Sequence, residues 1–204
     1  MSPRPYQLGK RQSQIDQSRR RIVDAALAQL ADSSSYTTFT VESVARRAEV
    51  ARATIYYQFE SKTGLLEALC DALAEAGQLS ELGVAFANPE PLGALRAFVA
   101  GFGRFWAVDR LAMRRLRALG ALDPEVGVVI GARDARRRAG LEVLVGRLEG
   151  TERAPAMREK VIQLLYALTS FETFDSLAGP DQSLTAAVDD VFRLASLALG
   201  LLPR

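Results

Sequence analysis

The sequence predicts an all-α protein: an N-terminal three-helix helix-turn-helix head followed by a larger helical body. Apolar residues recur three and four positions apart over long stretches, which is the spacing of a helix packed on one face. The alternation typical of exposed strands is absent, and Pro and Gly fall between the periodic stretches. With 204 residues, 49% of them hydrophobic, the chain can bury one or two compact cores.

The N-terminal residues divide into an arm and a helix. Residues 1–16 contain prolines and a glycine with little periodicity, and are predicted to form a mobile basic arm. The first firm helix is expected to open at Arg19-Arg20-Arg21 and to end at Ser33-Ser34-Ser35. Its apolar stripe is formed by Ile22, Val23, Ala26, Leu27 and Leu30.

Residues 40–59 predict two short helices joined by a tight turn. The Thr40 hydroxyl can cap the first of them, whose apolar residues share one face. In the second helix Ile55 and Phe59 lie four apart and therefore on one side. The positions left to face outward are Arg52, Ala53, Thr54, Tyr56, Tyr57 and Gln58.

These outward residues have the chemistry of a DNA-reading surface. A helix-turn-helix presents its second helix to the major groove, where Arg can donate twice to guanine and Thr can touch a thymine methyl. Tyr hydroxyls and Lys suit phosphate oxygens. We predict base contacts by Arg52, Gln58, Ala53 and Thr54, and phosphate contacts by Thr40, Tyr56, Tyr57 and Lys62.

Over roughly residues 18–70 the chain resembles the TetR family of transcriptional regulators. The matching residues are Tyr36, Thr40-Val41, Val44-Ala45, Ala48, Val50, Thr54 to Phe59, Ser61-Lys62 and Leu65. The resemblance implies a homodimeric, ligand-responsive repressor that binds a near-palindromic operator in double-stranded DNA and is released by a small-molecule effector.

Three positions depart from the family pattern. Ser35 and Glu49 stand where Gly is common, and Ala51 replaces the usual polar cap of the second helix. A non-Gly residue at positive φ costs about 1 kcal/mol, and a lost cap about as much again. These departures favour an alternative, a helical small-molecule-binding or adaptor protein with a degenerate DNA-binding head.

Charge and composition limit the other function classes. Residues 1–62 carry a net charge of +4 and the remainder −2, which fits a DNA-facing head; the arm is either a disordered terminus or a segment that follows phosphates or the minor groove. The chain has no His, no metal-ligand spacing and no phosphate-cradling loop, so we expect no enzyme, metal or cofactor. The lone Cys70, the absence of a secretory segment and the lack of a spanning apolar run favour a cytoplasmic protein away from membranes.

After the head, Ser61 caps a connecting helix that ends near Gly77, and Asn88-Pro89-Glu90-Pro91 is a boundary. Periodic stretches then predict body helices over 92–106, 110–119, 123–148, 155–178 and 184–198. The predicted domains are therefore the arm 1–16, the helix-turn-helix domain 17–62, and an effector-binding and dimerisation domain 63–204.

Two sites are predicted in the body. Aromatic and apolar side chains in one stretch suggest a pocket for an apolar or aromatic effector, against the alternative of plain core: Phe98, Phe102, Phe105, Trp106 and Met113. The last two helices carry stripes that suit a four-helix dimer interface, against the alternative that they pack within one chain: Leu164, Leu168, Phe171, Val188, Val191 and Ala195. The runs 114–117 and 136–138 are either solvated Arg faces or an anion-binding surface.

Overall fold

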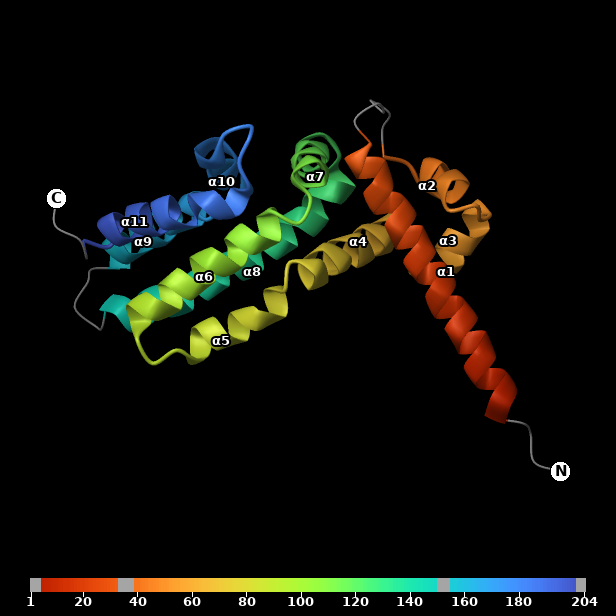
Figure 1. Cartoon of the computed structure of the whole chain (residues 1–204), viewed down its shortest axis with the longest axis horizontal. Coiled ribbons are helices and arrows are strands. Elements are labelled where there is room, and N and C mark those ends of the chain that lie inside the picture. The colour runs from red at the N-terminus through yellow and green to blue at the C-terminus, as the bar shows by residue number, and fades with distance from the viewer. Residues whose placement is uncertain (1–4, 33–38, 150–154, 201–204) are drawn as a thin grey trace. The chain divides into compact units, whose positions relative to one another are not determined.

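The computed structural model describes residues 5–32, 39–149 and 155–200, which are helical apart from short connections (Figure 1). The helices are α1 (Pro5–Ala31), α2 (Val41–Arg47), α3 (Arg52–Phe59), α4 (Lys62–Ala76), α5 (Leu82–Ala87), α6 (Pro91–Trp106), α7 (Arg110–Leu122), α8 (Pro124–Glu149), α9 (Pro155–Leu168), α10 (Phe171–Ala178) and α11 (Val188–Ala198), with 3-10 helices η1 (Leu79–Glu81) and η2 (Leu184–Ala187). No strand occurs among the described residues, and the all-α prediction is confirmed.

The helices form two compact units. The head unit comprises residues 1–72 with 114–129, and the body unit comprises residues 73–113 with 130–204. Helices α4, α7 and α8 each contribute to both units. The inclusion of 114–129 in the head unit had no signal in the sequence, because nothing local marks a segment that packs on residues far away in the chain.

In the head unit α2 packs against both α1 and α3, beside the C-terminal part of α1 (Figure 1). The core is built from apolar side chains, of which Ile22, Val44, Ile55, Leu65 and Leu69 are fully buried. Each comes from an element whose apolar residues recur at helical spacing, so burial of one face per helix builds this core.

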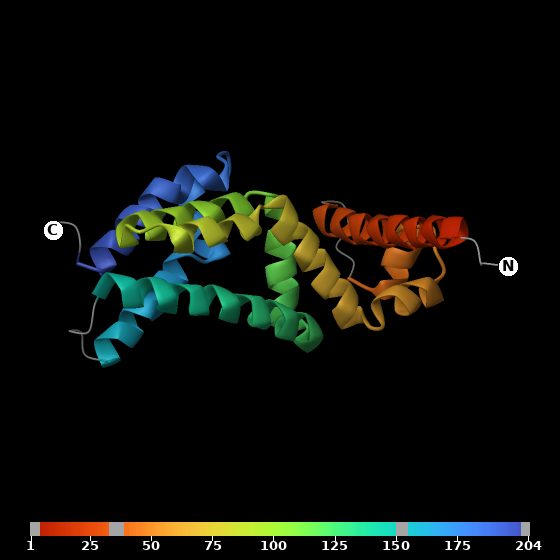
Figure 2. The same cartoon turned by 90° about the horizontal axis from the view of Figure 1, so that it is seen from below.

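The body unit is built around α6, which contacts α5, α10, α11 and η2. Figures 1 and 2 show α6 running alongside α11. Gly103 permits this approach, because a Cβ there would lie 2.6 Å from Val188 Cγ2. The buried Trp106 indole donates a hydrogen bond to the Thr169 carbonyl (3.1 Å), which fixes the end of α6 against the α9–α10 junction.

Several helix boundaries differ from the sequence predictions. α1 begins at Pro5, not near Arg19; Pro suits a first helical position, and the Lys, Arg and Gln that follow are good helix formers that need no apolar stripe. The expected helix 155–178 is broken: Ser170 caps a separate α10 by accepting from the Thr173 N–H (3.3 Å). Helices η1 and α5 were not predicted. The expected end at Ser33-Ser34-Ser35 and the matching Tyr36 lie outside the described residues.

Candidate nucleic-acid interface

The start of α2 is fixed by a reciprocal cap. Thr40 Oγ1 accepts from the Ser43 N–H (3.1 Å), and Ser43 Oγ accepts from the Thr40 N–H (3.3 Å). Gln29 of α1 also donates to Ser43 Oγ (2.6 Å), so the cap is tied to the first helix. The predicted cap at Thr40 is confirmed, and satisfying these terminal N–H groups stabilises the position of α2.

The turn between α2 and α3 forms without the glycine that is common there. Glu49 adopts φ 54°, as the pattern predicted. The Glu49 N–H donates to the Arg46 carbonyl (3.3 Å), and the Val50 N–H donates to the Ala45 carbonyl (3.0 Å). Ala51 provides no side-chain cap to α3. The helix-turn-helix geometry is therefore complete, with a local cost in stability at two positions.

Helix α3 presents most of its surface to solvent. Its inner face consists of Ile55 and Phe59, which are buried, as the spacing predicted. Tyr57 is 76% exposed, and Tyr56 is 37% exposed. Arg52 and Ala53 are exposed, whereas Thr54 and Gln58 are half-buried, and Thr40 before α2 is exposed. The outward positions are therefore placed as expected, and their roles in DNA binding stay predictions.

Two of these residues interact. Arg52 Nη2 donates to the Tyr56 hydroxyl (3.2 Å), and the guanidinium carbon lies 5.4 Å from the centre of the Tyr56 ring. A side chain predicted to read bases is thus held by one predicted to bind phosphate. This pairing restricts the rotamers of both before any ligand arrives, which lowers the entropy lost on binding.

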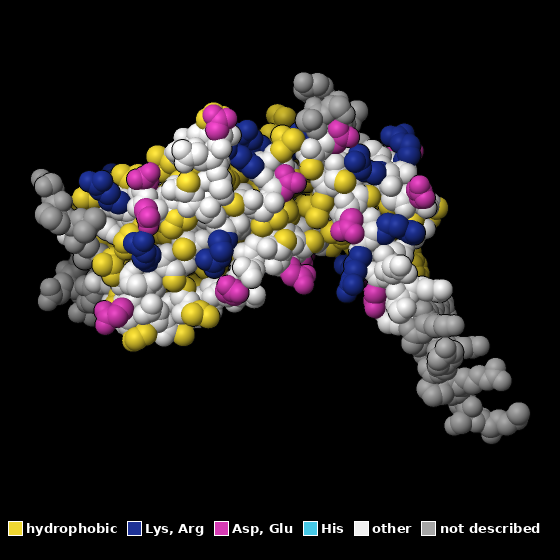
Figure 3. Space-filling view, viewed as in Figure 1, with side chains coloured by type: hydrophobic (Ala, Val, Ile, Leu, Met, Phe, Trp, Pro, Cys, Tyr) yellow, Lys and Arg dark blue, Asp and Glu magenta, His cyan; other side chains and the backbone are white. Residues whose placement is uncertain are grey.

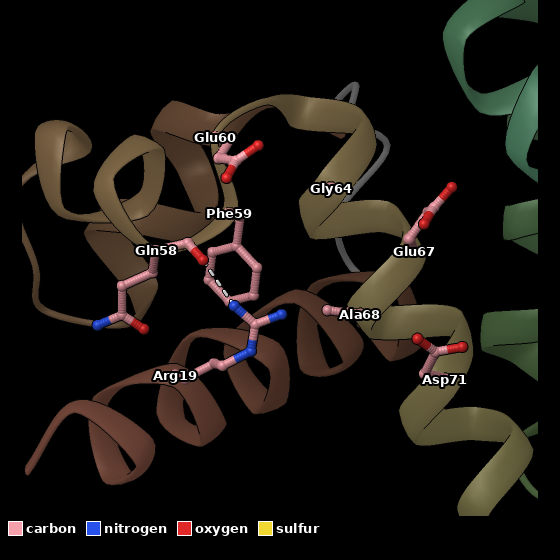
Figure 4. A pocket seen from close by; sticks show the side chains of 8 residues that line it. All are labelled: Arg19, Gln58, Phe59, Glu60, Gly64, Glu67, Ala68 and Asp71. Carbon is pink, nitrogen blue, oxygen red and sulfur yellow. Dashed lines mark hydrogen bonds between the residues drawn. The ribbon is translucent and has the colours of Figure 1, made fainter. Parts of the chain in front are cut away.

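The C-terminal end of α3 is held by Arg19 of α1 (Figure 4). The guanidinium donates from Nη1 to the Gln58 carbonyl (2.6 Å) and lies 4.2 Å over the centre of the Phe59 ring. These residues line an open pocket of about 320 Å³ whose other side carries carboxylates of Glu60 and Glu67. Arg19 therefore positions α3. The sequence showed a basic triplet but not which member turns toward α3.

Lys62, at the first turn of α4, is paired inside the head unit. Its ammonium forms ion pairs with Asp123 and with Glu125 (3.3 Å to Oε2). The Asp123 carboxylate raises the pKa of Lys62, and the ammonium lowers the pKa of Asp123. Ser61 caps α4 as predicted, accepting from the Gly64 N–H (3.0 Å). Phosphate binding by Lys62 stays a prediction, and a phosphate would have to approach the ammonium beside these two carboxylates.

Acidic and basic side chains are intermixed on the face drawn in Figure 3.

Within the described residues, no helix is long and apolar enough to cross a membrane. The same part of the chain contains no cluster of three or more potential metal ligands.

The comparisons with known proteins agree with this geometry. Residues 22–69, which span α2, α3 and most of α1's buried stripe, match the family model of bacterial regulatory proteins, tetR family. The chain carries a TetR-family head. No curated protein is similar enough to the chain to count as a match.

Solved structures extend the likeness to the fold of the whole chain. A TetR-like transcriptional regulator from Rhodococcus sp. RHA1 superposes with a TM-score of 0.63 at 23% identity, covering 90% of this chain and 96% of its own. A putative TetR-family transcriptional regulator from Mesorhizobium loti MAFF303099 gives a TM-score of 0.64 at 14% identity, covering 92% and 97%. The head therefore matches the TetR family model over residues 22–69, and the fold of the whole chain is like that of these two solved structures.

The residues predicted to line an effector pocket lie in the core of the TetR-like body. Phe98, Phe102, Trp106 and Met113 are buried, and Phe105 is partly exposed. Ring centres lie 4.8 Å apart for Phe98–Phe102 and 4.6 Å apart for Phe105–Trp106. Such direct ring contacts are what a filled core requires, so a pocket here stays a prediction that needs these side chains to move apart.

The residues predicted for the dimer interface are divided between core and surface. Phe171, Val191 and Ala195 are buried within one protomer, as in the alternative that these stripes pack within one chain, and their place in a dimer interface stays a prediction. Leu164 is 45% exposed, and Leu168 and Val188 are half-buried. The strongest apolar stripe of α11 faces α6 and α9 of its own chain. Other exposed apolar residues on α9, α10 and α11 are Met157, Leu177, Leu194 and Leu197.

Two arginines of the run 136–138 have separate structural roles. Arg137 is buried, with its guanidinium 4.2 Å over the Tyr166 ring and donating to Thr169 Oγ1 (2.9 Å). Because Arg137 is buried, it belongs neither to a solvated helix face nor to an anion-binding surface. Arg138 does follow the solvated-face interpretation, since it pairs with Glu142 and Glu159.

Proposed function

We propose that this regulator is a cytoplasmic, ligand-responsive repressor that binds a near-palindromic operator as a homodimer and is released by a small molecule. The observation that carries the proposal is the exposed outer face of α3, where Arg52 and Tyr56 are paired and Tyr57 is 76% exposed. A side chain that finds few partners within its own chain is available to an external one. Two copies of α3 would enter successive major grooves about 34–36 Å apart.

The roles within this face follow from chemistry. Arg52 and Gln58 would read base edges, with Ala53 and Thr54 against bases or thymine methyls. Thr40, Tyr56, Tyr57 and Lys62 would hold phosphates and set the register. The proposed domains remain 17–62 for DNA binding and 63–204 for the effector and the dimer, preceded by a basic arm.

An apolar or aromatic effector would act on the body. It would favour a dimer whose two heads are wrongly spaced for the operator, and it can shift that equilibrium only by its differential affinity for the two states. A preference of about 100-fold, about 2.7 kcal/mol, already weakens operator occupancy strongly.

The dimer surface in this proposal uses the exposed residues of the last helices. Leu164 of α9 is 45% exposed, and Leu194 and Leu197 of α11 are each 40% exposed. Leu168 and Val188 would lie at its edge. Apolar side chains in these positions suit burial between two copies of a helix pair.

The test is fluorescence anisotropy on DNA from upstream of the protein's own gene, with a scrambled duplex as control and a salt series. Sequence-dependent binding with a steep salt slope supports the proposal. The alternative is a ligand-binding protein with a degenerate head, which the strained Glu49 and the uncapped Ala51 support. Such a protein would bind both duplexes weakly and equally. A turnover assay on candidate effectors would detect an enzyme.

A further inference from the structure

The corner between α7 and α8 is attached to the head through charged and polar contacts. Asp123 ends the connection and caps α8, accepting from the Glu125 N–H (3.0 Å). Asp123 and Glu125 hold the Lys62 ammonium. On the other side of the corner Arg115 Nη1 donates to the carbonyls of Leu30 (3.1 Å) and Asp32 at the end of α1. The segment around the corner therefore contacts both the end of α1 and the first turn of α4.

The helices on both sides of Lys62 are closely packed: α7 against α8, and α4 against α3. A Cβ at Gly127 would lie 2.8 Å from the Gly120 carbonyl oxygen, so α7 and α8 cross closely at the corner. A Cβ at Gly64 would lie 2.1 Å from the Phe59 carbonyl oxygen, so the first turn of α4 is seated directly on the end of α3. The first turn of α4, which carries Lys62, therefore packs against the end of the recognition helix, and Lys62 itself pairs with the corner.

We propose that Asp123 and Glu125 compete with DNA phosphate for Lys62, so that the α7–α8 corner lowers the DNA affinity of the head. This inference rests on the proposed function, in which Lys62 binds phosphate. The Lys62 ammonium has three N–H donors, and a phosphate that accepts from one of them lies beside two carboxylates whose negative charge repels it. Binding of DNA phosphate at Lys62 and docking of the corner on Lys62 then weaken each other.

The consequence for regulation is reciprocal. If the docked corner weakens DNA binding by a given factor, DNA weakens docking of the corner by the same factor. Both helices of the corner continue into the body unit. A change in the body that tightens or loosens the corner therefore alters DNA affinity without touching the DNA-reading side chains.

The experiment is a double-mutant cycle measured by anisotropy on the upstream duplex and on the scrambled duplex, over a salt series. The variants of the full chain are Asp123→Asn with Glu125→Gln, Lys62→Met, and all three changes together. A matched control, Asp16→Asn with Asp24→Asn, removes two exposed carboxylates of α1 and changes the net charge equally. Circular dichroism confirms that each variant is folded.

The carboxylate variant is expected to bind both duplexes about threefold to fivefold more tightly than the control variant, which is the range of partly exposed ion pairs. Its salt slope should steepen by up to about 0.9, the value of one full phosphate contact. With Lys62→Met in place, the same two changes should have no more effect than the control pair.

Three results separate the outcomes. Equal tightening with and without Lys62 would show a general charge effect and overturn the inference. Weaker binding by the carboxylate variant would also overturn it, since the carboxylates would then position Lys62 for phosphate. Failure of every protein, wild type included, to bind either duplex would refute the proposed function instead.

Discussion

Helices α3 and α11 were predicted by the same reasoning but with different success. In α3 the residues expected inside, Ile55 and Phe59, are buried, and the outward positions are exposed or half-buried. In α11 Val191 and Ala195 were assigned to a surface and lie in the protomer's own core. An eight-residue helix with two large apolar residues has one possible inner face. Helix α11 carries apolar residues on two sides, and the protomer's core takes the side with Val191 and Ala195, whereas Leu194 and Leu197 are exposed.

The largest expected effect on stability comes from a substitution in α11, where a buried and an exposed side of one helix can be compared. Val191→Asp places a carboxylate at a fully buried position and should destabilise the protomer by about 4 kcal/mol or more. Leu194→Asp with Leu197→Asp alters side chains that are each 40% exposed and should leave the melting temperature nearly unchanged while producing monomers. Thermal unfolding and light scattering measure the two properties. A folded dimer carrying both surface charges would remove Leu194 and Leu197 from the interface.

The next effect sharpens the assignment of roles on α3. Arg52→Ala should reduce the preference for the upstream duplex over the scrambled one by about tenfold or more, because a bidentate base contact is lost. Tyr57→Phe, at the most exposed position, should weaken binding to both duplexes alike. Tyr56→Phe should fall between them, since its hydroxyl also accepts from Arg52. Anisotropy titrations give all three ratios. An unchanged preference after Arg52→Ala would assign that side chain to phosphate.

The sequence predicts interactions between residues that are close along the chain, and it does not predict those between residues far apart along the chain. The caps at Thr40 and Ser61 and the positive φ of Glu49 are local, and the structure confirms each. The partners of Arg19 and Lys62 are 39 and 61 residues away along the chain. A basic triplet and a helix-capping Asp-Pro give no sign of such pairing, since only the packed fold brings these groups together.

The break between α9 and α10 was likewise not predicted from the sequence, because it depends on contacts with residues distant along the chain. The stripe across residues 155–178 is periodic enough to predict one helix, but Thr169 donates its hydroxyl to the Leu165 carbonyl (2.8 Å) and Ser170 caps the next helix. Ser and Thr compete locally with helix hydrogen bonds, and the choice depends on neighbours such as Trp106 and Arg137, which contact this junction from α6 and α8.

A smaller effect tests the head's stability separately from its contacts. Ala51 has the extended backbone of a capping residue (φ −68°, ψ 144°) but no side chain able to cap. Ala51→Ser should raise the free energy of unfolding of the head by about 0.5–1 kcal/mol. The matched change Ala53→Ser, at an exposed position inside α3, should lower it by about 0.5 kcal/mol, because Ser has the poorer helix propensity. Urea unfolding compares them, and equal effects would exclude capping as the cause.

The smallest effect concerns the Lys62–Asp123 pair, for which the structure gives the directions of the two pKa shifts. Lys62 lowers the pKa of Asp123 below its ordinary 3.8, so the pair's contribution to stability is present above that pH and is lost as the pH falls through the lowered value. Asp123 raises the pKa of Lys62 above its ordinary 10.5, so the contribution is also lost as the pH rises through that raised value.

The change that isolates this charge is Asp123→Asn, because Asn can still cap α8. The difference in melting temperature between wild type and the variant should be constant near neutral pH and should shrink below about pH 4. Lys62→Met should show the same acid dependence, whereas Asp24→Asn serves as an exposed control in the same unit. A difference that persisted undiminished into acid would mean that Asp123 acts through its cap to the Glu125 N–H, and the corner would then be held to the head by Arg115 rather than by Lys62.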